Sequence, residues 1–124
     1  MANPNIVNVT SIYGNTTYLI PSTTSATVWT ALTPAVGTVN KVNNIVAANV
    51  TGSAVAVTVS INSAVSGGGT AYDIAYQISV PANASLIIID KTTSIYVGEA
   101  QSIVVTVGTG SALELTSSYE AITS

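Results

Sequence analysis

The sequence predicts an all-β fold, a single antiparallel β-sandwich of jelly-roll or immunoglobulin-like type with an irregular N-terminal arm. The β-branched residues dominate, with 17 Val and 18 Thr among 124 residues, and these side chains suit a pleated, half-buried surface. Short apolar runs are separated by turn residues about every 8 to 12 positions, which is the spacing of sandwich folds. No segment keeps an apolar stripe of helical period. The length predicts one domain.

Residues 1–37 are expected to form an N-terminal arm and edge strands. The apolar pieces in this region are short, and Pro21 ends one of them because proline has no N–H to donate to a strand ladder. Pro34 and Gly37 then interrupt the chain before the regular part begins. We expect this arm to pair with a neighbouring subunit by adding a strand to an exposed sheet edge.

Residues 38–124 are predicted to form the sandwich core. The clearest strand is 55–61, where Val or Ile alternates with Ala, Thr or Ser. The other expected strands are 42–50, 72–80, 86–89, 95–97, 103–107 and 113–119. The continuous run Leu-Ile-Ile-Ile at 86–89 indicates a strand that is buried on both faces or covered on one face by a partner.

Two features of the core region have a structural and a functional interpretation. Tyr72 and Tyr76 share the alternating face of the 72–80 strand, so we predict that they belong to the core and do not form a sugar-stacking platform. The three glycines at 67–69 are interpreted as a flexible linker. A phosphate loop would need a following Lys-Ser/Thr pair and a helix, and the sequence has neither.

The candidate interface residues are Tyr13, Tyr18 and Trp29, the large aromatic side chains of the irregular N-terminal region. Aromatic residues are enriched among the side chains that anchor protein interfaces. No catalytic, cofactor-binding or metal-binding residue is predicted.

Charged residues are scarce, and the chain contains no His, Arg or Cys. The seven charged side chains are Lys41, Lys91, Asp73, Asp90, Glu99, Glu114 and Glu120. Because catalysis draws on clustered titratable groups, we expect that the protein is not an enzyme and uses no cofactor. Two lysines and a net charge of −3 argue against a nucleic-acid partner. No apolar run approaches the roughly 20 residues that cross a bilayer, so no membrane partner is expected.

Two kinds of carboxylate chemistry are the alternatives to this interpretation. Asp73, Asp90, Glu99 and Glu114 have the oxygen ligands that calcium prefers, but their spacing matches no calcium loop. We therefore interpret them as solvated charges on loops and strand faces. A carboxylate pair for glycoside hydrolysis would need a cleft with aromatic walls, and the sequence does not indicate one.

The low charge also bears on assembly and location. A surface of Thr, Ser, Asn and small apolar groups has little charge repulsion, so we expect much of it to be covered in a homo-oligomer or larger assembly. A soluble monomer rich in Ser and Thr is the alternative. The start of the chain lacks a basic segment followed by an apolar one, so no secretory signal is predicted and synthesis in a cytoplasm is expected.

Four sequence features follow one another between residues 54 and 120. They are VAVTVSI at 55–61, the 72–80 strand followed by PANASL at 81–86, VGEAQSIVV at 97–105, and LELTSSYE at 113–120. In this order they resemble a loose family of small virion structural proteins of tailed bacteriophages. In that family a Pro-Ala step, an acidic turn before an Ile-x-Val strand and a final Ser-Tyr-Glu recur. Residues 1–14 are similar to proteins of marine cyanobacterial phages.

This resemblance implies a particle component without an active site. The expected function is that of a capsid decoration (cement) protein, which binds and stabilises the assembled shell within the virion. Its partners would be the major capsid protein or other virion proteins, and it would be made in the host cytoplasm. The alternative is a neck, tail or fibre component that binds host surface glycan. The segment KTTSI at 91–95 is longer and more polar than the Gly-Lys-Leu of the family, so the position in the particle stays open.

Overall fold

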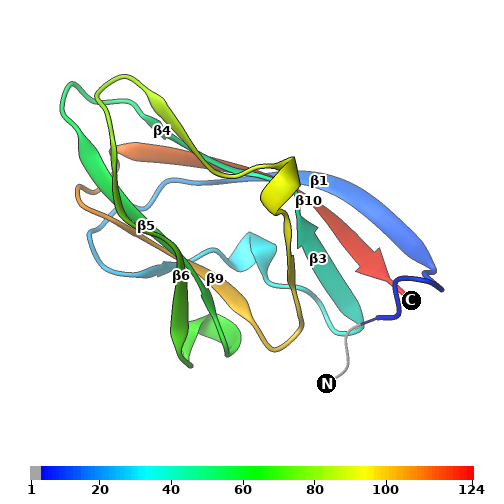
Figure 1. The fold of residues 1–124 in the computed structure, drawn as a ribbon. Coiled ribbons are helices and arrows are strands. Elements are labelled where there is room, and N and C mark those ends of the chain that lie inside the picture. The colour runs from blue at the N-terminus through cyan, green and yellow to red at the C-terminus, as the bar shows by residue number, and fades with distance from the viewer. Residues whose placement is uncertain (1–3) are drawn as a thin grey trace.

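The protein is described by a computed structural model that covers residues 4–124; residues 1–3, the start of the expected N-terminal arm, lie outside the described residues. The described chain is all-β, with ten strands and three 3₁₀ turns in two antiparallel sheets (Figure 1). The predicted β-sandwich is therefore confirmed. Within residues 4–124 no helix is both long and apolar enough to cross a membrane.

The strands follow one another with short connections. The strands are β1 (Ser11–Leu19), β2 (Thr27–Val28), β3 (Thr38–Val42), β4 (Ile45–Asn49), β5 (Val55–Asn62), β6 (Ala71–Val80), β7 (Ser85–Ile89), β8 (Ile95–Val97), β9 (Ser102–Val107) and β10 (Leu113–Thr123). The 3₁₀ turns are η1 (Thr30–Leu32), η2 (Val65–Gly67) and η3 (Lys91–Thr93).

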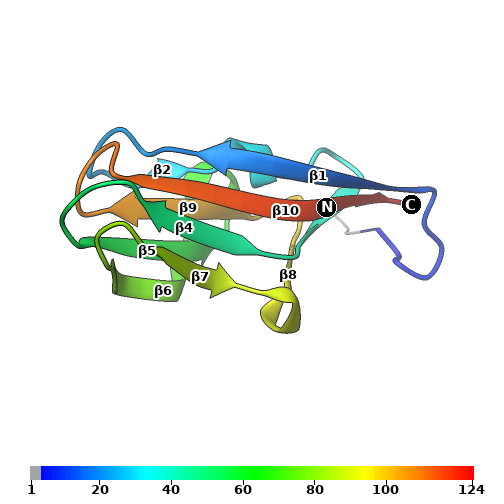
Figure 2. The same cartoon turned by 90° about the horizontal axis from the view of Figure 1, so that it is seen from above.

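The six-stranded sheet is organised around β10, which runs along its whole length (Figure 2). On one side, β10 pairs with β1 through nine consecutive residue pairs. On the other side, it pairs first with β4 and then with β3. Strands β7 and β8 continue the sheet beyond β4 and β3, respectively. Strands β3 and β4 therefore act as one bent strand, and so do β7 and β8.

The four-stranded sheet has the order β2-β9-β5-β6. When each bent pair is counted as one strand, the chain alternates between the two sheets at every connection except the β5–β6 hairpin. This is the jelly-roll topology, with its two interleaved Greek keys. An immunoglobulin domain instead places its A, B, E and D strands together and its C, F and G strands together. The jelly-roll alternative of the prediction is the one that the structure adopts.

The N-terminal region is part of this sandwich. Strands β1 and β2 each form a sheet edge, paired with β10 and β9 of the same chain. The turn η1 lies between β3 and β9 (Figure 1), where the Asn40 side-chain amide donates to the Leu32 carbonyl at 2.9 Å. Residues 4–37 thus contribute two edge strands and part of the core.

Trp29 is a core residue, so its predicted role as an exposed interface anchor is wrong. Its side chain is 1% exposed and packs in the cluster that both sheets build. Its backbone N–H donates to the Ile103 carbonyl at 2.8 Å, which ties the start of η1 to β9. Burial of so large an apolar surface between the sheets stabilises more than exposure at a solvated face would.

The prediction that Tyr72 and Tyr76 belong to the core is also wrong, since they are 61% and 62% exposed. The pairing of β6 with β5 shifts register twice, between Val57 and Val59 and again between Val59 and Ser60. Each shift adds an unpaired residue to β6 and reverses which face the next side chains occupy. Tyr76 lies at these shifts, beside Ala75, which opposes Val59 of the inner face, so the shifts turn Tyr76 away from the core. Tyr72 opposes Ile61 on the inner side and is exposed near the end of the edge strand β6.

The apolar run at 86–89 is covered on one face only within this chain. Ile89 is 1% exposed and belongs to the core, but Ile87 is 63% exposed. A register shift in the β4–β7 pairing places Ile87 opposite Val46 on the outer face of the six-stranded sheet. Burial on both faces, the first alternative, does not occur within the chain.

The loop with three glycines is held in place by hydrogen bonds and is not a free linker. The Gly69 backbone N–H donates to Asn62 Oδ1 at 2.8 Å, and the Gly67 N–H donates to Ser102 Oγ at 3.0 Å. Ser102 Oγ in turn donates to the Ala64 carbonyl at 2.7 Å. Gly67 has a φ of 70°, which L side chains rarely adopt. The loop therefore covers one end of the outer face of the four-stranded sheet.

Candidate interaction surface

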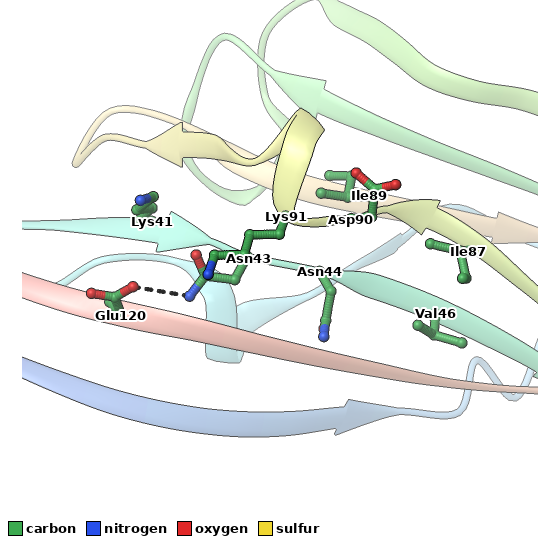
Figure 3. A pocket seen from close by; sticks show the side chains of 9 residues that line it. All are labelled: Lys41, Asn43, Asn44, Val46, Ile87, Ile89, Asp90, Lys91 and Glu120. Atoms are coloured by element: carbon green, nitrogen blue, oxygen red, sulfur yellow. Dashed lines mark hydrogen bonds between the residues drawn. The ribbon is translucent and has the colours of Figure 1, made fainter.

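The outer face of the six-stranded sheet carries an open hollow of about 480 Å³ (Figure 3). Its lining combines charged, amide and aliphatic side chains from four strands and the turn η3. The residues are Lys41, Asn43, Asn44, Val46, Ile87, Ile89, Asp90, Lys91 and Glu120. We call this region the charged hollow.

The break between β3 and β4 gives the charged hollow its position. Asn43 and Asn44 fill the break, and the backbone N–H of each donates to the Ser118 carbonyl of β10. Asn44 Oδ1 accepts from the Ser118 N–H at 2.9 Å, so its side chain replaces a ladder bond. The Asn43 amide points along the face and donates to Glu120 Oε1 at 3.1 Å (Figure 3). The bend thus turns polar side chains outward.

The turn η3 brings the second lysine to the same region. Asp90 Oδ1 accepts from the Thr92 backbone N–H at 2.9 Å and from the Thr92 hydroxyl at 2.6 Å. The Thr93 hydroxyl accepts from the Asp90 N–H at 3.1 Å, which completes a capping box. The Thr92 hydrogen bonds lower the pKa of Asp90 below its ordinary value. Lys91 begins this capped turn.

Charge is concentrated in the hollow to a degree that the sequence does not indicate. It contains both lysines of the chain, together with two of its five acidic residues. Lys41 and Glu120 are directly opposed across β3 and β10. The only signal in the sequence is that the chain has just two cations. Their meeting depends on the pairing of β3 with β10 and on the place of η3 beside them.

A row of mainly apolar side chains crosses the same face and borders the hollow. The strand registers place Ile87 opposite Val46, Val46 opposite Thr116, and Thr116 opposite Tyr18. The row therefore spans β7, β4, β10 and β1. Ile87 is 63% exposed and Tyr18 is 74% exposed, so both ends of the row present large apolar surface to solvent. We call these four residues the outer row.

The predicted interface residues are divided by the structure. Tyr13 and Tyr18 are both exposed on β1, at 66% and 74%. Because they are five residues apart on one strand, they project from opposite faces of the sheet. Tyr18 therefore belongs to the outer row and Tyr13 does not, while Trp29 is in the core.

The four carboxylates considered for calcium are dispersed. Across residues 4–124, no three His, Cys, Asp or Glu side chains come together as a possible metal site. Asp73, Asp90 and Glu114 are exposed, as expected of solvated charges. Glu99 differs, because it is 7% exposed and its Oε1 accepts from the Gly37 N–H at 2.8 Å. The expectation of a solvated charge is wrong for Glu99.

Charged, amide and aliphatic side chains adjoin one another on this face. Figure 3 shows the aliphatic side chains of Val46 and Ile87 at one side of the hollow and the side chains of Lys41 and Glu120 at the opposite side. The hollow therefore offers hydrogen-bond donors and acceptors next to apolar surface.

Comparisons with known proteins identify similar folds. No protein-family model matches the chain, and no curated protein matches it. A structure of the Bacillus endospore appendages, which form disulfide-linked pili, has a TM-score of 0.50 at 14% identity, over 92% of this chain and 88% of that chain. The virus-like particle of the extra small virus of the giant freshwater prawn Macrobrachium rosenbergii has a TM-score of 0.44 at 14% identity, over 98% of this chain and 86% of that chain. At this identity the first match shows a shared fold, and the second is too distant to add to it.

Proposed function

We propose that the chain is a structural subunit of a larger protein assembly, and specifically a capsid decoration protein of a tailed-phage virion. The observation that carries this proposal is the outer row. It leaves Ile87 and Tyr18 exposed on one sheet face of a chain with only seven charged residues. Exposed apolar groups that line up across a rigid sheet mark a surface that binds another protein.

Two further arguments support the proposal. Residues 54–120 resemble phage virion structural proteins, which implies the major capsid protein or another virion protein as partner. A fold shared with a subunit of pilus-forming appendages is in keeping with a role in repeated assemblies. We also propose that the chain has no catalytic activity, since it lacks His, Arg and Cys and its carboxylates are dispersed.

The proposed mechanism is mechanical. The jelly roll is a rigid body whose outer row would be buried against the shell, with a gain of roughly 25 cal/mol for each Å² of apolar surface removed from water. The charged hollow beside the row would select the orientation, because its lysines and carboxylates require complementary groups on the shell. A copy that contacts two neighbouring shell subunits then opposes their separation.

A neck, tail or fibre component that binds host surface glycan is the second candidate. The charged hollow favours it, since Asn43, Asp90 and Lys91 could donate to or accept from sugar hydroxyls (Figure 3). Aromatic stacking partners for a sugar ring do not line this hollow. For that reason we rank glycan binding below shell binding.

The test is localisation by electron microscopy. An antibody raised against the purified chain would be used with a gold label on phage particles and filaments from cells that express the gene. Labels spread over the shell would support decoration. Labels confined to the neck, tail or fibres would support the second candidate, and a glycan array would then identify the ligand. If all antigen stayed in the soluble fraction, with particles and filaments unlabelled, the structural proposal would be wrong.

A further inference from the structure

We propose that the free edge of β1 is an interface between two copies of this chain, in which the two β1 strands pair antiparallel about a two-fold axis. This inference deepens the proposed function, because it names the contact through which copies join. It rests on a comparison of the sheet edges in the described structure and on the self-complementarity of β1.

Strand β1 has none of the features that normally prevent edge pairing. Its sequence SIYGNTTYL contains no charged residue and no proline. Its nine pairs with β10 run without a register shift, so the strand has no bulge. A long, regular and uncharged edge presents a row of free backbone groups to another strand. The hydrogen bond from the Asn15 side chain to the Tyr13 carbonyl, at 3.3 Å, is long and would be easily exchanged.

The other sheet edges are each interrupted. Strand β6 carries Asp73, two register shifts and a positive φ of 48° at Gln77. The edge formed by β7 and β8 is broken by η3, which places Asp90 and Lys91 there. Strand β2 is only two residues long. Charges, bulges and short strands are the usual protections against edge-to-edge association. Among these edges, β1 alone lacks them.

The symmetry of an antiparallel pair determines one full register. A two-fold axis perpendicular to the sheet keeps the outer faces of both copies on one side, so opposed residues must have numbers of equal parity. The register that engages all nine residues of β1 places Asn15 opposite Asn15 of the second copy. Tyr18 then lies opposite Ile12 on the outer face, and Tyr13 lies opposite Thr17 on the inner face.

This register covers the large exposed side chains of β1. Ile12, Tyr13 and Tyr18 are 52%, 66% and 74% exposed in the single chain. Pairs of an aromatic with a β-branched residue are among the favourable cross-strand contacts, and no like charges are opposed. The outer row of each copy, which ends at Tyr18, would then continue to Ile12 of the other copy on the same face of the joined sheet.

A single cysteine tests the contact and its register. The chain has no cysteine, so Asn15→Cys introduces the only thiol. Opposed residues have Cβ atoms about 4.5–5.5 Å apart, close to the distance that a disulfide spans, so we expect covalent dimers after mild oxidation. Tyr18→Cys is the register control, because the two thiols would be about 20 Å apart along the strands. Tyr76→Cys on the interrupted edge β6 is the control for random collision.

Reversible association gives an independent measurement. We expect sedimentation equilibrium of the intact chain to show a dimer, and Tyr18→Lys to raise its dissociation constant at least tenfold. Tyr76→Lys should leave the constant unchanged, since that tyrosine is also well exposed but lies on the other sheet. Circular dichroism would verify that both variants fold.

The inference would be overturned by a monomer at high concentration, or by Asn15→Cys dimers no more abundant than those of Tyr76→Cys. A monomer that still labels particles would overturn only the β1 contact and leave the proposed function intact. If the chain forms the β1 dimer but no particle or filament is labelled, the β1 contact stands and the proposed function is overturned.

Discussion

The two sheets of this jelly roll differ in how completely the chain covers them. At one end, the outer face of the four-stranded sheet is closed by the loop at 63–70, and Ser60, Asn62, Ser102 and Val104 are buried there although they point away from the core. At the other end Ala56, Thr58 and Thr106 line a shallow hollow. The outer face of the six-stranded sheet is covered only at one end, where Pro4 and Ile6 lie against Val39. Elsewhere it presents the outer row and the charged hollow to solvent.

This difference separates two uses of similar side chains. Hydroxyl and amide groups on the four-stranded sheet hold the chain's own loop and therefore contribute to folding stability. Comparable groups on the six-stranded sheet remain available to another molecule. The comparison predicts that changes on the closed side lower stability, whereas changes on the open side alter association and leave stability nearly unchanged.

The largest loss of folding stability is expected when Trp29, in the interior, is replaced. Trp29→Ala should lower the free energy of unfolding by about 3–5 kcal/mol, because it removes a large buried side chain and leaves a cavity. Tyr18→Ala on the open sheet should change it by less than about 0.5 kcal/mol. Urea unfolding followed by circular dichroism measures both. Similar losses for the two variants would contradict the assignment of Trp29 to the core and Tyr18 to the surface.

The next effect concerns the loop over the four-stranded sheet. Asn62→Ala removes the acceptor for the Ala64 and Gly69 N–H groups at 3.0 and 2.8 Å. Because Asn62 is 4% exposed, we expect a loss of about 2–3 kcal/mol.

Asn43→Ala is the matched control on the open sheet. It removes the side-chain hydrogen bond to Glu120 and should lower the free energy of unfolding by about 1 kcal/mol or less. Hydrogen exchange should show faster opening of residues 63–70 in Asn62→Ala and not in Asn43→Ala. Equal protection of that loop in both variants would mean that Asn62 does not hold it.

The lysines of the charged hollow should matter for binding and little for folding. Lys41→Gln with Lys91→Gln should change the free energy of unfolding by no more than about 0.5 kcal/mol, since exposed charges contribute little. Binding to particles should become weaker and less dependent on NaCl, because screening acts on charges. Co-sedimentation with particles at low and moderate NaCl measures this. Unchanged binding of the double variant would exclude the hollow from the contact.

The smallest effect is a local pH dependence at η3. The pKa of Asp90 is lowered in the folded chain, because Thr92 donates to the carboxylate. The stabilisation of the turn is therefore complete above the ordinary pKa of an aspartate and is lost as the pH falls through the lowered folded value. The Thr92 amide resonance should shift with a midpoint below about pH 3.9. Asp90→Asn should abolish that shift, and a midpoint above the ordinary value would contradict the capping geometry.

Much of the architecture follows from local patterns that could be read in the chain. The alternation at 55–61 predicted β5, and the strands expected near 103–107 and 113–119 correspond to β9 and β10. The strand expected at 42–50 is split between β3 and β4 by the break at Asn43 and Asn44. The break depends on how β3 and β4 both pair with the distant strand β10, and local alternation carries no information on that pairing.

The candidate site could be predicted only in part. The sequence indicated that exposed aromatics lie in the N-terminal region, and Tyr13 and Tyr18 are exposed there. It did not indicate the charged hollow, whose lining comes from β3, β4, β7, η3 and β10. It also misplaced Tyr76, because register shifts in β6 depend on the partner strand, and Tyr72, because its exposure depends on its place near the end of an edge strand.

The sequence by itself determined the all-β class, the low charge and most strand positions, because these depend on composition and on short-range period. Only the tertiary structure decided the strand order of the jelly roll, the burial of Trp29 and the placement of Lys41 and Lys91 around one hollow. Those features depend on which distant strands pair and in which register. Pairing energies between strands far apart in the chain are set by packing in three dimensions, and no local pattern records them.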